Sequence, residues 1–126
     1  RDARRMLPKR VPLNSAVEQA GNLAGFTLGL HANDFELLGR SMVDLFAEPI
    51  RAELIPGYHG VRNAAIDAGA IGSGISGSGP SLFALSDSEE KAESIGKAMV
   101  KAFKKVGLKS RTFSSPIHSI PPEILD

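Results

Sequence analysis

Apolar side chains recur at the three-to-four-residue spacing of amphipathic helices along the first part of the chain. Asn14 or Ser15 is a candidate N-cap for a first helix, and the segment His31-Ala32-Asn33-Asp34 is expected to break that helix and cap a second. The second helix is expected to end at Glu48-Pro49, because a residue that precedes proline avoids the helical region. The apolar positions are Val17, Ala20, Ala24, Thr27 and Leu28 in the first helix, and Phe35, Leu38, Met42, Leu45 and Phe46 in the second.

Two more helices are predicted further along. One runs from about His59 to Ala68 and stops at Gly69, since glycine favours a helix C-terminus. The other has Asp87 as its N-cap, with Glu90 completing a capping-box pattern, and stops at Gly107. Their inward positions are Val61, Ala64, Ala65 and Ala68 in the former, and Ile95, Ala98, Met99, Ala102, Phe103 and Val106 in the latter.

Short strand-like runs flank a glycine-rich segment between these two helices. Residues 70–76 and 81–86 predict a hairpin with an enlarged turn, and residues 109–114 predict another strand. Residues 50–57 are expected to form a connecting loop, and residues 116–126 an irregular tail. This order predicts a single α+β domain over residues 1–126, a sandwich with helices packed on one face of a mainly antiparallel sheet.

Glycine recurs every fourth residue in the first predicted helix, at Gly21, Gly25 and Gly29. Each glycine costs a helix about 1 kcal/mol relative to alanine. We therefore expect another backbone to pack closely against this helix.

Composition narrows the functional classes. The chain has 126 residues, with 15 basic and 14 acidic side chains, so no overall charge favours nucleic acid or an anionic membrane. Without cysteine, disulfides, thiolate nucleophiles and cysteine metal sites are excluded. No apolar run approaches the roughly 20 residues that a membrane helix needs, and no apolar stretch follows the basic start as in a secretory signal. A soluble protein of a reducing, cytoplasmic compartment is expected.

The segment Gly72-Ser73-Gly74-Ile75-Ser76-Gly77-Ser78-Gly79-Pro80-Ser81 is the most unusual feature of the chain. Glycines let the backbone approach a ligand, and successive N–H groups can bind an anion. Its G-x-G-x-x-G pattern is not a dinucleotide fingerprint, because a strand rather than a helix is predicted to follow. The Walker pattern fails as well, since Ser78 stands where lysine is required. A phosphate or small-ligand cradle and a structural turn remain open.

Arg51 is the most informative charged residue, because its planar guanidinium suits a carboxylate or phosphate and its segment is bounded by prolines. A surface arginine paired with Glu48 or Glu53 is the alternative. The three histidines, His31, His59 and His118, lack the spacing of a metal site, and no metal is expected.

Two segments carry a resemblance to a known family. Residues 74–85, GISGSGPSLFAL, resemble the third motif of the small-molecule kinases that include galactokinase, homoserine kinase and mevalonate kinase. Within that family, the Gly-Pro-Ser ending is most similar to homoserine kinase, as are residues 48–57, EPIRAELIPG. Residues 4–8 and 23–26 fit more loosely. The resemblance spans nearly the whole chain and implies the ferredoxin-like C-terminal domain of such a kinase.

The resemblance implies an activity and a set of site residues. The full enzyme would transfer the γ-phosphoryl group of ATP to the hydroxyl of L-homoserine, in threonine biosynthesis. Arg51 would bind the substrate carboxylate, and the glycine loop would close the site through Ser76, Gly77, Ser78 and Gly79. Some relatives carry a second arginine around residues 19–22, where this chain has none.

The family's ATP-cradling motif, Gly-Leu-Gly-Ser-Ser at the start of a helix, is absent from these residues. The resemblance therefore implies that an N-terminal domain holds most of the ATP and Mg²⁺ site and the catalytic residues, and that this chain alone is inactive. Homoserine, that N-terminal domain and a second copy in a homodimer are the partners considered. The alternatives are another substrate within the kinase family, or a non-catalytic ferredoxin-like module that binds a ligand or a partner.

Overall fold

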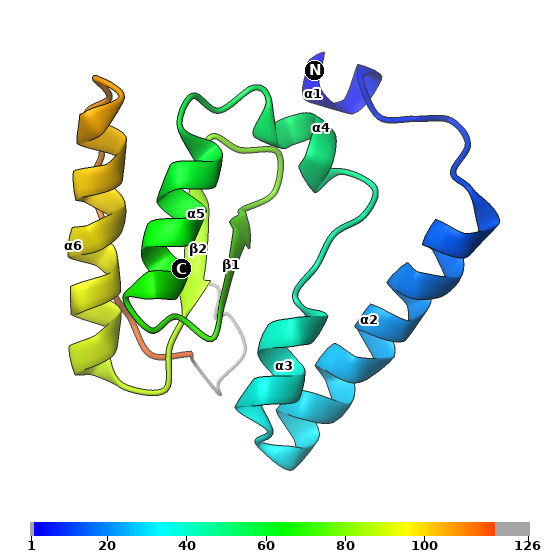
Figure 1. Cartoon of the computed structure of the whole chain (residues 1–126), viewed down its shortest axis with the longest axis horizontal. Coiled ribbons are helices and arrows are strands. Elements are labelled where there is room, and N and C mark those ends of the chain that lie inside the picture. Colours follow the sequence, from blue (N-terminus) through cyan, green and yellow to red (C-terminus); the bar gives the residue numbers. More distant parts are fainter. Residues whose placement is uncertain (1, 118–126) are drawn as a thin grey trace, which may run out of the picture.

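An antiparallel hairpin lies near the middle of the chain in the computed structural model, which describes residues 2–117 (Figure 1). Strand β1 (Gly72–Ile75) pairs with β2 (Leu82–Leu85), so that Gly72 faces Leu85 and Ile75 faces Leu82. The described helices are α1 (Asp2–Arg5), α2 (Leu13–Ala32), α3 (Phe35–Ser41), α4 (Glu48–Ala52), α5 (Tyr58–Asp67) and α6 (Glu89–Lys105).

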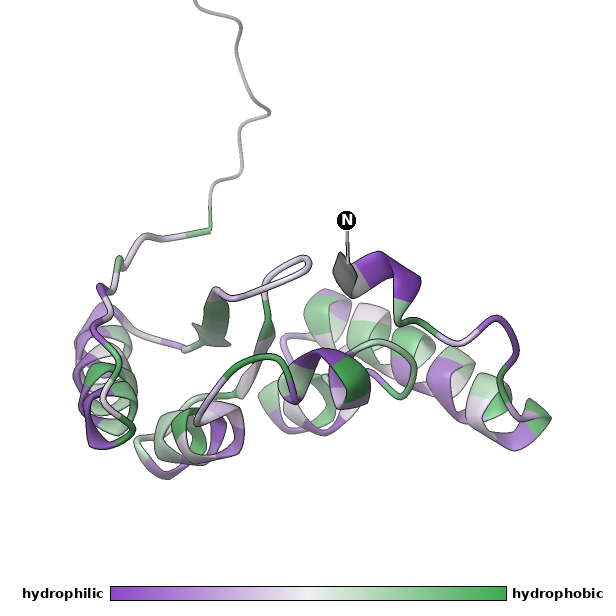
Figure 2. Cartoon of the chain, turned by 90° about the horizontal axis from the view of Figure 1, so that it is seen from above, coloured by the Kyte–Doolittle hydropathy of each residue, from purple (hydrophilic) through white to green (hydrophobic). Residues whose placement is uncertain are grey.

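Helices α5 and α6 pack against each other and against the hairpin, and Figure 2 shows α5 on one side of the two strands. The buried cluster of Ala52, Ile55 and Tyr58 is completed by partly buried residues from both strands and from α6: Ile75, Leu82 and Phe103. On the inner face of α5, Val61 and Ala65 are fully buried. The predicted α+β fold, with helices on an antiparallel sheet, is confirmed.

Helices α2 and α3 form a helical hairpin through a tight turn. Asn33 takes the left-handed conformation at the end of α2, with φ of 54°. Asp34 caps α3 by accepting a hydrogen bond from the backbone N–H of Leu37 at 2.9 Å. The predicted close backbone approach occurs at Gly29, where a Cβ would lie 2.8 Å from the backbone nitrogen of Leu38. It does not occur at Gly21, where a Cβ would meet nothing within 4 Å.

The apolar face predicted for α2 is exposed in the part of the chain that the structure describes. Val17 is 64% exposed and Leu28 is 57% exposed. A shallow apolar groove runs along this face, lined by Ala20, Leu23, Ala24, Thr27, Leu28 and His31. The opposite side of α2 contacts α3 through Gly25 and Gly29. Small residues therefore make the internal contact, and large apolar residues face outward.

The structure of residues 42–57 differs from two of the sequence predictions. The second helix ends at Ser41 rather than at Glu48-Pro49, and the predicted loop at 50–57 contains part of α4. Pro49 lies in the first turn of α4 instead of ending a helix. Proline is tolerated there because the first N–H groups of a helix need no partner within the helix.

The helix starts and the C-terminal segment give further corrections. The first long helix begins after Pro12, and its start has no side-chain cap, so neither Asn14 nor Ser15 caps it. Ser88 is the N-cap of α6, whereas Asp87 accepts a hydrogen bond from Lys91 Nζ at 2.7 Å, which lowers the pKa of Asp87. Residues 109–114 do not form a strand, and Thr112 instead lies against Gly96 of α6. Residue 1 and the tail from His118 onward lie outside the described residues.

Candidate active site

Arg51 and the glycine loop, predicted as two halves of a site, are in direct contact. Arg51 lies in α4, and its Nη1 donates a hydrogen bond to the carbonyl oxygen of Gly77 at 2.8 Å. The two residues are 26 positions apart in the sequence. The bond brings a guanidinium group to the tip of the turn between β1 and β2.

The turn depends on glycine at two positions with left-handed backbone conformation, Gly77 with φ of 59° and Gly79 with φ of 78°. It is closed by the N–H of Ser76, which donates to the carbonyl of Ser81 at 2.8 Å, and by the N–H of Gly79, which donates to the carbonyl of Ser76 at 3.1 Å. Within the described residues, the N–H groups of Gly77 and Ser78 donate to no acceptor. Two successive free N–H groups at an exposed loop tip can bind an anion.

A cleft of about 280 Å³ opens beside Arg51, between α2, the segment that follows α3, and the hairpin. The polar residues that line it are Gln19, Asn22, Ser41, Asp44, Glu48, Arg51 and Ser73. The apolar ones include Phe26, Met42, Ile75 and Phe83. Of the predicted site residues, Arg51 and Gly77 line the cleft. Ser76 and Ser78 are exposed beside it, while a Cβ on Gly79 would point at the buried Ile55, 3.0 Å away.

Buried polar groups lie beneath Arg51. Glu48 Oε1 lies 3.9 Å from Arg62 Nε, and Tyr58 is only 2% exposed. Burial, reinforced by the negative charge of Glu48, raises the pKa of Tyr58 above its ordinary value. Arg51 Nε is also buried and makes no hydrogen bond within the described residues. An unpaired buried donor on a charged group costs stability.

Sequence reasoning missed the other polar residues of the cleft. Glu48 belongs to the Glu-Pro-x-Arg segment that carried the resemblance, so the sequence did indicate that this segment contributes to the site. Asp44 precedes a helix that was not predicted, and Gln19 and Asn22 were noted only as positions without an arginine. Their convergence depends on how α2 folds back along the chain, which no local pattern encodes.

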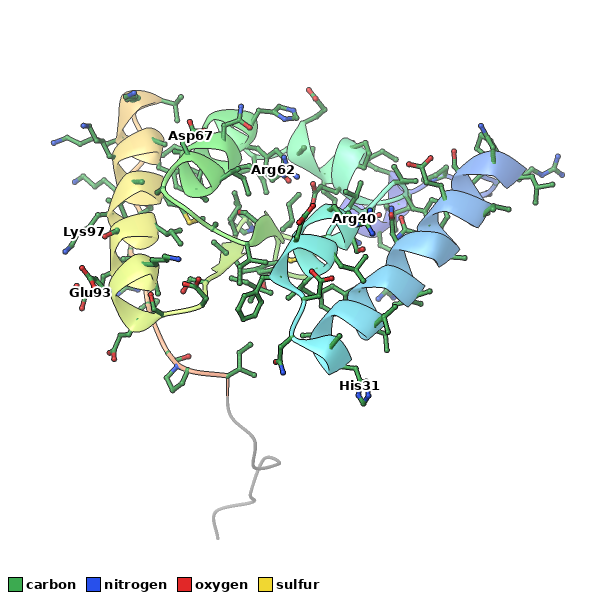
Figure 3. All side chains as sticks on the ribbon, turned by 60° about the horizontal axis from the view of Figure 1, so that its bottom comes forward. His31, Arg40, Arg62, Asp67, Glu93 and Lys97 are labelled. Carbon is green, nitrogen blue, oxygen red and sulfur yellow. The ribbon has the colours of Figure 1, made fainter. Side chains whose placement is uncertain are left out.

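His31 and His59 do not line the cleft, and His118 lies outside the described residues. His31 lies at the C-terminal end of α2, where Figure 3 shows it projecting from the molecule, and His59 is exposed at the start of α5. No group of three or more His, Asp or Glu side chains that could hold a metal ion occurs among residues 2–117. Within the same residues, no helix is long and apolar enough to span a membrane.

The fold, the Glu-Pro-x-Arg segment and the glycine turn together define a class of protein. A family model described as "GHMP kinases C terminal" matches residues 26–105. This match covers more than half of the chain, and the chain belongs to the GHMP kinases C-terminal family. The predicted resemblance to small-molecule kinases is confirmed.

Several similar proteins are named homoserine kinase. A homoserine kinase of Chloroherpeton thalassium is 52% identical over 116 residues, which are 91% of this chain and 36% of that protein. A homoserine kinase of Haloarcula marismortui is 42% identical over 117 residues, 93% of this chain and 40% of that protein. The crystal structure of homoserine kinase from Cytophaga hutchinsonii matches with a TM-score of 0.81 and 55% identity, over 83% of this chain and 33% of that one. The chain therefore spans little more than a third of the length of these relatives.

Proposed function

We propose that this chain is the C-terminal domain of a cytoplasmic, ATP-dependent homoserine kinase, which converts L-homoserine to O-phospho-L-homoserine in threonine biosynthesis. The observation that carries the proposal is the contact between Arg51 and the loop carbonyl of Gly77, because a guanidinium group and the tip of the glycine loop then lie at one cleft. The identity to proteins named homoserine kinase supports the substrate. The direct test is phosphorylation of homoserine by the full-length protein.

Arg51 is proposed to bind the substrate carboxylate. Its Nη1 is already committed to Gly77, whereas its Nε has no partner within the described residues. A guanidinium can donate two parallel hydrogen bonds to one carboxylate. An amino-acid substrate needs such a cation, and a neutral sugar does not.

The glycine loop is proposed to face the phosphoryl group through the free N–H groups of Gly77 and Ser78, with the hydroxyls of Ser76 and Ser78 beside them and Gly79 supporting the turn. When bound, ATP supplies the phosphoryl group, and Mg²⁺ offsets its negative charge. We propose that both are held mainly by an N-terminal domain of the longer protein. Residues 1–126 alone are expected to have no kinase activity.

Replacing Gly77 tests whether the loop faces a ligand. We expect Gly77→Ala in the full-length protein to reduce homoserine phosphorylation tenfold or more. Alanine strains a left-handed position by about 1–2 kcal/mol and so displaces the N–H groups. Gly107→Ala is the matched control, because Gly107 also has positive φ, 78°, and open space around its Cβ position. Both variants should lower the melting temperature similarly. Equal activity in the two variants would make the loop a structural turn.

The exposed apolar face of α2 is proposed to pack against the N-terminal domain. Leu23 borders both the cleft and the groove on this face, so a domain that closed the cleft would reach the groove. A homodimer through the same face is the alternative partner.

A charge placed in the groove distinguishes these partners. Leu28→Lys in the full-length protein is expected to lower the free energy of unfolding by about 2 kcal/mol or more, because it removes a leucine that is exposed in this domain and that the proposed interface would bury. The molar mass measured by light scattering should stay unchanged. Ile66→Lys, at a similarly exposed position on α5, is the control. Conversion of a dimer to a monomer would instead indicate the homodimer, and no effect beyond the control would show that the face is solvated.

A further inference from the structure

Gln19 connects α2 to a segment far along the chain. Its side-chain Oε1 accepts a hydrogen bond from the backbone N–H of Leu45 at 2.8 Å, and its Nε2 donates to the carbonyl oxygen of Val43 at 3.3 Å. The partner groups fix which way the amide points, because a backbone N–H can only donate and a carbonyl can only accept. The side chain of Gln19 thus binds the backbone of the residues on both sides of Asp44.

Asp44, between these two residues, organises the start of α4. Its Oδ1 accepts from the N–H groups of Phe46 and Ala47 at 2.8 and 2.9 Å, and its Oδ2 accepts from the N–H of Glu48 at 3.1 Å. Both carboxylate oxygens are therefore engaged in shaping the turn that leads into the helix. The N–H of Arg51 then donates to the carbonyl of Ala47 at 2.9 Å, one helical turn later.

Helix α4 has only five residues, and a helix of that length is not stable by itself. Its direction is set by the residues that hold its ends. At the N-terminal end, Asp44 holds the turn that leads into the helix, and Gln19 holds Val43 and Leu45 on either side of Asp44. At the C-terminal end, Ala52 and Ile55 enter the buried cluster.

From these contacts we propose that Gln19 is a positioning residue for Arg51, acting through residues 43–48 to aim the guanidinium at the cleft. The inference rests on the proposed function, in which Arg51 binds the substrate carboxylate. Gln19 acts on substrate binding without a need to touch the substrate. The amide provides both the donor and the acceptor, which no charged or apolar side chain of similar length can supply.

The test compares Gln19→Leu, which loses both hydrogen bonds, with Gln19→Glu, which keeps only the acceptor, in the full-length enzyme. Loss of hydrogen bonds of ordinary strength predicts a rise of about fivefold in the homoserine KM for Gln19→Leu. Gln19→Glu should lie between Gln19→Leu and the unmodified enzyme. The KM for ATP and kcat should change less than twofold. Glu18→Gln, exposed on the same helix, is the control and should behave as the unmodified enzyme.

A double variant separates positioning from a general loss of structure. If Gln19 acts only through Arg51, Gln19→Leu should add almost nothing to the homoserine KM in an Arg51→Ala background. Additive effects would overturn the proposal, as would an unchanged KM in Gln19→Leu. If Gln19→Leu fails to fold, Gln19→Glu carries the same comparison.

A readout that needs no turnover keeps the proposal separate from the proposed function. The NMR signal of Arg51 Nε–H should broaden or shift in Gln19→Leu and stay unchanged in Glu18→Gln. An unchanged signal in Gln19→Leu would overturn the positioning role. If the unmodified enzyme did not phosphorylate homoserine, the proposed function would fail, and this signal would still decide whether Gln19 positions Arg51.

Discussion

Arg51→Ala in the full-length enzyme is expected to raise the KM for homoserine tenfold or more, a loss of about 1.4 kcal/mol or above in substrate binding. The guanidinium lines the cleft, donates a hydrogen bond to Gly77 of the loop, and has a buried Nε that bonds to nothing in the part of the chain that the structure describes. Its removal takes away a bidentate donor and leaves the loop carbonyl unpaired. Steady-state kinetics with homoserine varied at saturating ATP would measure the change.

Two variants make this result specific. Arg51→Lys keeps the positive charge but not the planar fork, so its homoserine KM should lie between those of Arg51→Ala and the unmodified enzyme. Arg40→Ala removes an exposed arginine of α3 (labelled in Figure 3) that does not line the cleft, and should leave the KM unchanged. If Arg51→Ala had the same homoserine KM as Arg40→Ala, Arg51 would not belong to the substrate site.

The second large effect concerns two glycines of the same helix, for which we expect alanine to act with opposite signs. Gly29→Ala should destabilise the protein by about 2 kcal/mol, because an added methyl group overpacks the contact between α2 and α3. The Cβ would lie 2.8 Å from the backbone nitrogen and 3.0 Å from the Cα of Leu38, and neither atom can move without shifting α3. Gly21→Ala should stabilise the protein by about 0.5–1 kcal/mol, since its Cβ would meet nothing within 4 Å and alanine favours the helix.

Chemical denaturation of the two variants and the unmodified protein would provide both changes in the free energy of unfolding. The comparison is controlled internally, because the two variants share the substitution and the helix. A destabilised Gly21→Ala would mean that this part of α2 contacts something outside the described residues. A neutral or stabilising Gly29→Ala would contradict the close packing of α2 on α3.

Much of the fold was predictable because its signals are local. The stripe of α6 from Ile95 to Phe103, the glycine-rich hairpin and the stop at Gly69 each follow from spacing or from turn chemistry within a few residues. Where the sequence signal was ambiguous, the prediction failed. Pro49 can end a helix or open one, and here it opens α4 after a turn in which Asp44 accepts hydrogen bonds from the N–H groups of residues 46–48. Residues 109–114 have a strand-like pattern, but a strand also needs a partner, and the described sheet consists of β1 and β2 alone.

The residues of the candidate site likewise fall into those with a local sequence signal and those without one. Arg51 and the glycine loop were identified from their own segments, because a guanidinium between prolines and a run of glycines are locally unusual. Gln19 and Asp44 are ordinary residues in the sequence, and their importance arises from hydrogen bonds spanning up to 26 positions. The exposure of Val17 and Leu28 could not be predicted either, because an apolar stripe has the same spacing whether it packs in a core or against another domain.

The most direct test of the central claim is phosphoryl transfer by the full-length protein, with L-homoserine, galactose and mevalonate offered separately with Mg-ATP. The predicted result is ATP-dependent formation of O-phospho-L-homoserine, with much lower turnover of galactose and mevalonate. Preferred phosphorylation of galactose or mevalonate, or no phosphorylation of homoserine by a folded full-length protein, would contradict it.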